Sequence, residues 1–367
     1  MPGDVTTYET PRPSPLDDLE ALAEVVRTAR VVAIGESAHH VREYYDLRLR
    51  LTRFLVEQCG FSVFAMESGF SEGLAVDEWV RGGPGDVADV AARHITYRMG
   101  QCAEMREHLS WMRSAGVRFS GIDVPGSATS PLPGLLRLRH LPGVDEIIQL
   151  VRAYADEEGM AAYAAYAAMP QPDRDRITAL LADLTVRLET GDADDTARRE
   201  LRLVVLLDQL LRGNVAARDL GMAETVLALA VTEPGTKIVV GAANSHIQRV
   251  PMALPGITVP TMGHRLAERL GDAYVAIGVT AIAGVTPTRR RDPSAPGGVA
   301  VVGAELPAPR EGSVEAAGAG MHDLRGRHEG PTAIRVLDGW QETDVPAAYD
   351  VVVTLPEISP AEQVSGR

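Results

Sequence analysis

Carboxylate and imidazole side chains follow four short apolar runs of the sequence, at the points where those runs end. The residues at these four points are Glu36 with His39, Glu67, Asp123, and Asn244 with His246. An imidazole titrates near neutral pH and can take a proton from water, and a neighbouring carboxylate fixes its tautomer and stabilises its charged form. Brought together, these residue types would suit acid–base chemistry.

The apolar runs themselves predict the strands that position these side chains. Predicted strands span 31–34, 61–66, 117–122 and 237–240, and later ones span 274–279 and 349–354. Helical patterns lie between the early strands, at 16–29, 41–58, 72–80 and 102–114. This alternation predicts an α/β fold with a central, mostly parallel sheet flanked by helices.

Ligands of open parallel sheets bind beyond the carboxyl ends of the strands. If the first four predicted strands are neighbours, three carboxylates and two imidazoles converge on one crevice. Any one of these residues alone could be the polar start of a loop, and the sequence does not show the strand order. Their coincidence at four strand ends favours a functional site.

The character of the sequence changes after residue 125. A stretch rich in Pro, Gly and Ser at 125–133 predicts turns, and residues 144–230 are rich in Ala, Leu, Arg and Glu without a strand pattern. We interpret residues 1–125 as an α/β half, 126–232 as a helical insertion that covers the cleft, and 233–367 as a second α/β half with His246 and the final strand. Residues 285–335 carry many Gly, Pro and Arg and predict loops with short strands.

Arg48 occupies an unusual position on the helix predicted over 41–58. The apolar stripe of that helix runs through Tyr44, Leu51 and Leu55, and Arg48 lies on the same stripe. A charge on a buried face needs a partner. Arg48 therefore either pairs with a site carboxylate or a substrate oxygen, or extends its guanidinium to solvent at the helix edge.

Other kinds of site find little support in the sequence. No Gly-x-Ser-x-Gly segment surrounds Ser37, Ser68 or Ser127, so a serine nucleophile of the usual hydrolase type is not expected. The segment 35–39 is not the zinc-binding His-Glu-x-x-His pattern, and the two cysteines are not spaced as metal ligands. We expect neither a metal nor a cofactor.

Composition limits the class of partner. The chain has 367 residues and a formal net charge of −14, which argues against nucleic acid and anionic membrane surfaces as partners. It has two cysteines, no apolar run of about 20 residues, and no basic region followed by an apolar one at its N-terminus. We expect a cytoplasmic protein with a small-molecule substrate, and the sequence leaves its oligomeric state open.

Several of these segments resemble the erythromycin esterase family. Residues 35–39, Gly-Glu-Ser-Ala-His, resemble the family's Gly-Glu-x-x-His segment, and residues 60–70 are similar to its Gly-Phe…Glu-x-Gly-Phe segment. Residues 121–124 are similar to its Gly-(Ile/Met)-Asp-Val segment, and 243–247 to its His-Asn-x-His-Ile segment. With a similar closing strand at 349–356, the resemblance spans roughly residues 30 to 355.

The family resemblance implies a metal-independent hydrolase that opens a macrolide lactone. By resemblance, His39 would be the general base that activates water, and Glu36 would orient His39 or the water. Glu67, Arg48 and His246 would complete the catalytic site. The candidate substrate-binding residues are Asp123, Asn244, Ala243, His94 and Arg98.

The sequence departs from the family pattern at Ala243, where the family has the first histidine of His-Asn-x-His. This predicts a changed substrate or reaction. The expected function is ester or lactone hydrolysis of a bulky natural product, in antibiotic resistance or in natural-product biosynthesis. The alternatives are a biosynthetic tailoring enzyme that catalyses dehydration, cyclisation or acyl transfer, and a non-catalytic binder of a macrolide-like ligand.

Overall fold

An eight-stranded sheet forms the centre of the molecule in the computed structural model, which describes residues 15, 19–192, 194–232, 235–292, 294–295 and 298–362. The strand order is β3-β2-β4-β1-β7-β12-β9, and β8 pairs with β7 outside this path. The strands are β1 (Val31–Ile34), β2 (Val63–Gly69), β3 (Arg118–Asp123), β4 (Ile238–Gly241), β7 (Tyr274–Arg291), β8 (Val299–Glu305), β9 (Gly320–Asp323) and β12 (Val351–Ile358).

The predicted mostly parallel sheet is confirmed. Neighbours from β3 through β12 run parallel, and β9 and β8 pair antiparallel to β12 and β7. The first four strands in sequence, β1 to β4, are therefore adjacent, so their carboxyl ends lie at one edge of the sheet. This is the arrangement that the sequence could not show.

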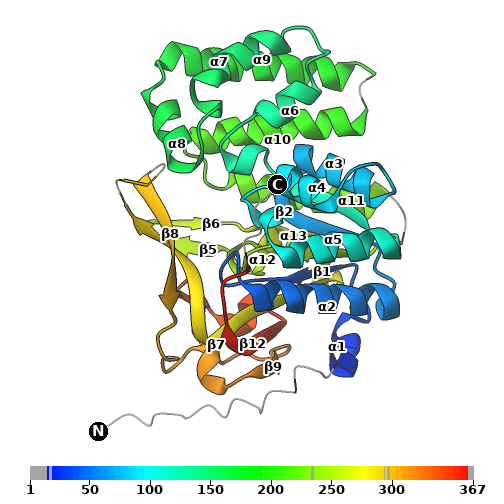
Figure 1. Cartoon of the computed structure of the whole chain (residues 1–367), viewed down its shortest axis with the longest axis vertical. Helices are drawn as coiled ribbons and strands as arrows, with labels where there is room; N and C mark the ends of the chain where they lie inside the picture. The colour runs from blue at the N-terminus through cyan, green and yellow to red at the C-terminus, as the bar shows by residue number, and fades with distance from the viewer. Residues whose placement is uncertain are drawn as a thin grey trace.

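Strand β7 is much longer than predicted. It continues to Arg291 and pairs with β8 as an antiparallel ribbon (Figure 1), where the sequence predicted loops with short strands from residue 285. Short strands are present in this range, at β8, β9 and β10 (Ala333–Val336), but the extension of β7 was missed because Pro287 and three consecutive arginines suggested irregular structure. Pro287 is tolerated because β7 has only β8 as a partner in this part, and the three arginines at its end are exposed.

One face of the sheet is covered by helices from the first part of the chain. Alternate strand residues, such as Val32, Ile34, Phe64 and Met66, pack into one apolar core on this face, as strand geometry requires. The helices of this layer are α1 (Leu19–Val26), α2 (Arg42–Cys59), α3 (Phe70–Val80), α4 (Val87–His94) and α5 (Ala103–Ala115). Helix α2 ends at Gly60, whose left-handed φ of 75° fits the stop predicted there.

The opposite face packs against α11 (Ala217–Thr232) and α13 (Met262–Leu270). Met222, Ala223 and Val226 of α11 join the intervening strand residues, such as Val31 and Val240, in a second core. Helix α11 thus packs against the sheet, although its sequence continues the strand-free segment. This placement carries the start of α11 to the carboxyl edge of the strands.

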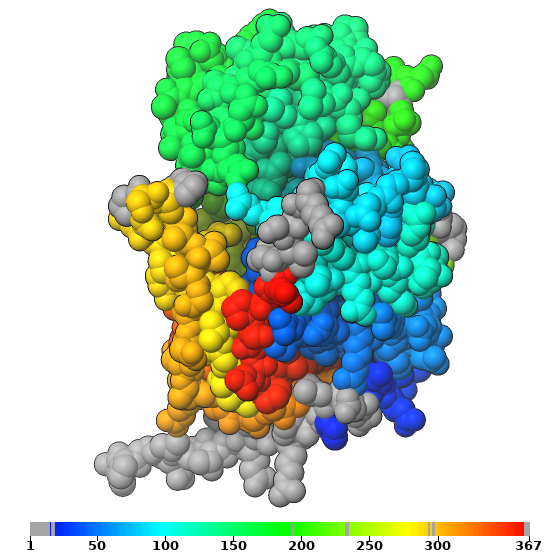
Figure 2. All heavy atoms as spheres, viewed as in Figure 1, coloured from blue at the N-terminus to red at the C-terminus, as the bar shows by residue number. Residues whose placement is uncertain are grey.

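The remaining helices of that segment form a separate layer above the sheet edge (Figure 1), with an apolar core of their own. They are α6 (Leu132–Arg137), α7 (Val144–Ala155), α8 (Gly159–Ala168), α9 (Gln171–Thr190) and α10 (Asp195–Leu211). Figure 2 shows a recess in the surface where this helical layer, the β7–β8 ribbon and the cyan part of the chain, near residue 100, meet.

Short elements complete the described chain. The hairpins are β5 (Met252–Leu254) with β6 (Ile257–Val259), and β10 (Ala333–Val336) with β11 (Gly339–Glu342). The short helices are α12 (Asn244–Ile247), α14 (Val345–Ala348), and the 3-10 turns Met99–Gln101, Gly126–Ala128, Gly271–Ala273 and Val314–Ala317. No helix of the described residues is long and apolar enough to cross a membrane.

Candidate active site

The structure brings the sequence-predicted residues Glu36, His39, Glu67 and His246 together at the carboxyl edge of β1, β2 and β4. Glu36 and His39 follow β1, Glu67 lies near the end of β2, and His246 lies in α12 after β4. Glu67 is central, because its Oε1 atom is 3.9 Å from His39 Nε2 and 3.4 Å from His246 Nε2. The two imidazoles therefore lie on either side of one carboxylate.

Glu36 links His39 to Arg48. Glu36 Oε1 lies 2.6 Å from His39 Nδ1, and Glu36 Oε2 accepts a hydrogen bond of 2.7 Å from Arg48 Nη2. Arg48 is only 1% exposed and Glu36 2%, whereas the His39 side chain is 23% exposed. The buried charge of Arg48 is thus paired with a site carboxylate. Of the three side chains, His39 is the most exposed to solvent.

The charges around His39 favour its protonated form. Burial alone would lower the pKa of His39, but the hydrogen bond to Glu36 and the negative charge of Glu67 raise it above the usual value of 6.5. Burial likewise opposes ionisation of Glu36, but Arg48 and His39 hold its pKa below the usual range. Glu36 is therefore ionised, and its Oε1 atom accepts a hydrogen bond from His39 Nδ1–H.

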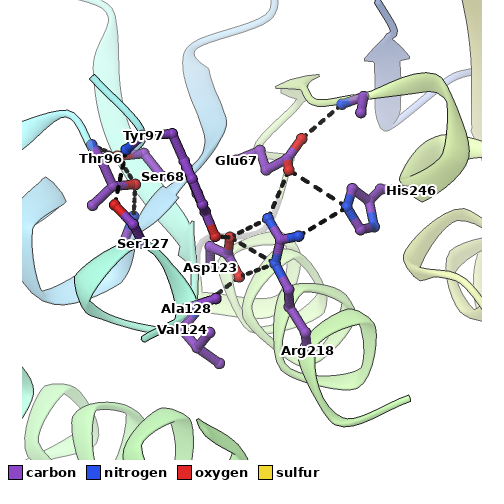
Figure 3. A network of polar contacts seen from close by, with 12 residues as sticks. Glu67, Ser68, Thr96, Tyr97, Asp123, Val124, Ser127, Ala128, Arg218 and His246 are labelled. Atoms are coloured by element: carbon purple, nitrogen blue, oxygen red, sulfur yellow. Dashed lines mark hydrogen bonds and ion pairs between the residues drawn. The ribbon is translucent and has the colours of Figure 1, made fainter. Parts of the chain in front are cut away.

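Arg218 lies at the centre of the other half of the site (Figure 3). Its Nη2 atom donates to Glu67 Oε1 at 2.7 Å and to Asp123 Oδ2 at 2.6 Å, and its Nε atom lies 3.0 Å from both carboxylate oxygens of Asp123. Its Nη1 atom is 3.2 Å from His246 Nε2. Asp123 is fully buried, while the Arg218 side chain as a whole is 20% exposed.

His246 is held by Asp219, the residue after Arg218. His246 Nδ1 lies 2.9 Å from Asp219 Oδ1, and the same oxygen accepts a 2.8 Å hydrogen bond from the backbone N–H of Met262. Burial opposes protonation of His246, but Asp219 and Glu67 outweigh it and raise its pKa to about 10. His246 is therefore protonated at neutral pH, and its Nε2–H points toward Glu67 rather than accepting from Arg218.

Glu67 is ionised despite its burial. Burial would raise its pKa, but the charges of His246 and Arg218 hold it well below the usual range. Its second oxygen, Oε2, accepts a 2.7 Å hydrogen bond from the backbone N–H of Ala243. Ala243 thus contributes its backbone to the site, at the position where the family pattern has a histidine side chain.

The other sequence candidates have different surroundings. Both amide atoms of Asn244 bond the backbone of Val279, at 2.8 and 3.0 Å, and so join α12 to β7. The exposed Arg98 pairs with Glu158 at 2.8 Å, and His94 is partly buried at the end of α4. Only the remaining candidates, Asp123 and Ala243, contact Arg218 or Glu67 directly.

Sequence reasoning missed Arg218 and Asp219. Both lie in the first turn of α11, inside a segment whose sequence predicts only helices. A signal was present: an adjacent Arg–Asp pair precedes a run of apolar residues that buries against the sheet. Without knowledge that α11 leaves the helical layer for the sheet, this pair was indistinguishable from an exposed helix start.

Among the described residues, no group of three or more His, Cys, Asp or Glu side chains is arranged to hold a metal ion. The site instead consists of charge pairs that bond one another. Such an arrangement can move a proton through His39, and it can stabilise negative charge through the guanidinium of Arg218.

Comparison with known proteins gives a consistent result. The family model described as erythromycin esterase matches residues 56–358. The chain is 27% identical over 401 aligned residues to an erythromycin esterase type II from Escherichia coli, covering 95% of this chain and 94% of that protein. It is 26% identical to an erythromycin esterase type I from Escherichia coli, covering 84% of this chain and 85% of that protein.

Solved structures share the fold. A mutant of erythromycin esterase EreC in its open conformation has a TM-score of 0.78 at 24% identity, covering 95% of each chain. A succinoglycan biosynthesis protein has a TM-score of 0.73 at 19% identity, covering 95% of this chain and 93% of that one. At these identities, the likeness establishes a common architecture.

Proposed function

Since the chain belongs to the erythromycin esterase family, we propose that it is a hydrolase that uses His39 to activate water against an ester or lactone of a bulky natural product. The observation that carries this proposal is the buried Glu36 carboxylate 2.6 Å from His39 Nδ1. When neutral His39 keeps its proton on Nδ1 and donates it as a hydrogen bond to Glu36, its lone pair is on Nε2. That atom lies 3.9 Å from Glu67 Oε1, so one water molecule can contact both.

The hydrolytic step uses His39 and Arg218. His39 Nε2 takes a proton from the water, whose oxygen forms a bond to the substrate carbonyl carbon while the π electrons move to the carbonyl oxygen. The guanidinium of Arg218 stabilises the resulting oxyanion. When the tetrahedral intermediate collapses, the bond to the alcohol oxygen breaks, and His39 returns its proton to that oxygen.

His246 and Asp123 act on this step through Arg218 and Glu67. Protonated His246 and Arg218 keep Glu67 ionised, and Glu67 in turn supports the charge that develops on His39. Helices α6–α10 lie above this edge of the sheet (Figure 1), and we propose that they cover the cleft and limit the size of the substrate.

The origin of the oxygen tests hydrolysis directly. The protein is incubated with a panel of macrolide and polyketide esters in H₂¹⁸O, and the products are analysed by mass spectrometry. Hydrolysis places one ¹⁸O atom in the product acid, and His39→Gln should abolish that product. Turnover without ¹⁸O incorporation would contradict the proposal.

Ala243 favours a second candidate, a tailoring reaction in natural-product biosynthesis. The backbone of Ala243 bonds Glu67, but its side chain offers no imidazole to the site. Dehydration, cyclisation or acyl transfer to an alcohol needs the same base without a water nucleophile. The ¹⁸O experiment separates the two, because these reactions leave no solvent oxygen in the product. Stoichiometric binding without any turnover would instead indicate a ligand-binding protein.

A further inference from the structure

Two turns beside the site hold non-glycine residues in the left-handed region. Tyr97 and Arg98 have φ angles of 56° and 58°, and Ser127 and Ala128 have φ angles of 53° and 61°. This conformation costs roughly 1–2 kcal/mol for each residue that carries a Cβ atom. Such backbone persists only where surrounding contacts impose it, and it tends to occur at functional sites.

The two turns contact each other through Tyr97. The backbone N–H of Tyr97 donates a 3.0 Å hydrogen bond to Ser127 Oγ. In the same region, Ser68 Oγ, directly after Glu67, accepts a 3.0 Å hydrogen bond from the backbone N–H of Thr96 (Figure 3). The turn at Tyr97 is thus fixed from two sides.

Tyr97 lies beside both His39 and Arg218. The centre of its ring lies 6.3 Å from the centre of the His39 ring, with an angle of 20° between the ring planes. The guanidinium carbon of Arg218 is 5.2 Å from the centre of the Tyr97 ring, within the range of a cation–π contact. The hydroxyl donates a 2.8 Å hydrogen bond to Asp123 Oδ2, which also accepts from Arg218. Tyr97 therefore limits where both His39 and Arg218 can lie.

Helix α8 of the helical layer contacts the next residue of each turn. The hydroxyl of Tyr163 donates a 3.1 Å hydrogen bond to the carbonyl oxygen of Ala128. Arg98 pairs with Glu158, just before α8, but both side chains are well exposed, and such pairs contribute at most about 1 kcal/mol. Of the two links between α8 and the turns, the Tyr163 bond is the less exposed to solvent.

We propose that Tyr97 is a positioning residue that holds His39 and Arg218 in place, and that α8 fixes Tyr97 through the Tyr163–Ala128 contact and the two strained turns. This inference rests on the proposed function for the roles of His39 and Arg218. Its consequence is that the helical layer, besides lying over the cleft, determines the geometry of the groups within it.

The pKa of His39 provides a test without substrate. Histidine-labelled protein is titrated by NMR, and the His39 signals are assigned by their loss in His39→Gln. Burial and the charge of Arg218 lower this pKa, Glu36 and Glu67 raise it, and His40 also lies beside the ring. Tyr97→Leu should admit water and release Arg218, so the pKa of His39 should rise by about half a pH unit or more.

Variants of α8 test the second half of the proposal. Tyr163→Phe removes the hydroxyl and leaves Tyr97 intact, and we expect a smaller rise in the same direction. Glu158→Gln is the matched control, for which we expect no change.

The outcomes are decisive for each part. An unchanged His39 pKa in folded Tyr97→Leu would overturn the positioning role, and an unchanged value in Tyr163→Phe would overturn the link to α8. Tyr163→Phe keeps the test valid should Tyr97→Leu fail to fold. Because no substrate is present, these results stand apart from the ¹⁸O experiment, which alone decides the proposed reaction.

Discussion

Arg218 Nη2 lies 2.7 Å from Glu67 Oε1, although the two residues are 151 positions apart in the sequence. The first belongs to a helix and the second to a strand, so this contact joins the strand-free segment of the chain to the strand ends. Because Glu67 is almost completely buried, its ionised form depends on the charges of His246 and Arg218 together.

Arg218→Met should destabilise the protein strongly. The substitution leaves Glu67 and Asp123 buried without their shared cation, and breaking a buried pair typically costs roughly 3–5 kcal/mol. Urea denaturation measures the free energy of unfolding. The control is Arg202→Met, which breaks an exposed pair with Glu224 on the neighbouring helix and should cost no more than about 1 kcal/mol. Equal losses in the two variants would contradict the structural role of Arg218.

His39→Gln should lower kcat/KM by about 10²–10⁴-fold, the usual contribution of a general base. His40→Gln is the matched control, since the adjacent imidazole has no hydrogen bond to Glu36 or Glu67 among the described contacts and should leave kcat/KM unchanged. Both are measured with the substrate that the ester panel identifies. A loss for His40→Gln comparable to that for His39→Gln would place the base elsewhere.

The pH dependence of kcat/KM should reflect the raised pKa of His39. Only neutral His39 can accept a proton, and its pKa lies above 6.5, so kcat/KM should increase with pH and reach half its maximum above pH 6.5. Glu36→Gln removes the hydrogen-bonded charge that raises the pKa, so the midpoint should move to lower pH. A wild-type midpoint below pH 6.5 would be inconsistent with these charges.

Stability should depend on pH through His246. Its folded-state pKa of about 10 exceeds the usual 6.5, so the protonated form contributes stability that is fully present below pH 6.5 and is lost as pH rises through about 10. The difference in unfolding free energy between wild type and His246→Gln should therefore shrink from pH 6 to pH 10. In Asp219→Asn, the pH-dependent loss of stability should occur at lower pH than in the wild type. A difference in unfolding free energy between wild type and His246→Gln that stayed constant from pH 6 to pH 10 would refute the raised pKa of His246.

Ala243 should distinguish this protein from erythromycin-opening relatives. We expect little ring opening of erythromycin by the wild type, because loss of one group that binds water or an oxyanion costs roughly 10²–10³-fold in rate. Ala243→His should raise the activity if the missing imidazole is the cause. Mass spectrometry follows the opened lactone. Efficient opening by the wild type, unchanged in Ala243→His, would show that Ala243 marks no change of function.

The sequence predicted the strand-end half of the site and not the helical half. Glu36 and Glu67 could be placed because short buried strands are recognisable and parallel strands share one carboxyl edge. Arg218 could not, because its position depends on α11 leaving the helical layer for the sheet, which local pattern does not encode. Asn244 shows the converse limit: its place after a strand suggested a role with substrate, but its amide bonds the β7 backbone.

Arg48 illustrates a third case. Its place on an apolar stripe showed that a partner was required but left open whether the partner was solvent or a carboxylate. The structure supplies Glu36, from the adjacent strand end. Likewise, the ribbon of β7 and β8 was missed because a long strand with Pro287 has no simple alternation, and only its pairing with β8 reveals it.

The charges of the described site have a thermodynamic consequence for its ligands. The site contains four carboxylates, those of Glu36, Glu67, Asp123 and Asp219, but only two guanidinium groups, those of Arg48 and Arg218. Its net charge is therefore zero only when both His39 and His246 carry a second proton. This charge balance favours protonation of both imidazoles. A ligand that brought its own ammonium group near Glu67 would compete with those protons and release them to the buffer, whereas a neutral ester would leave the proton count unchanged.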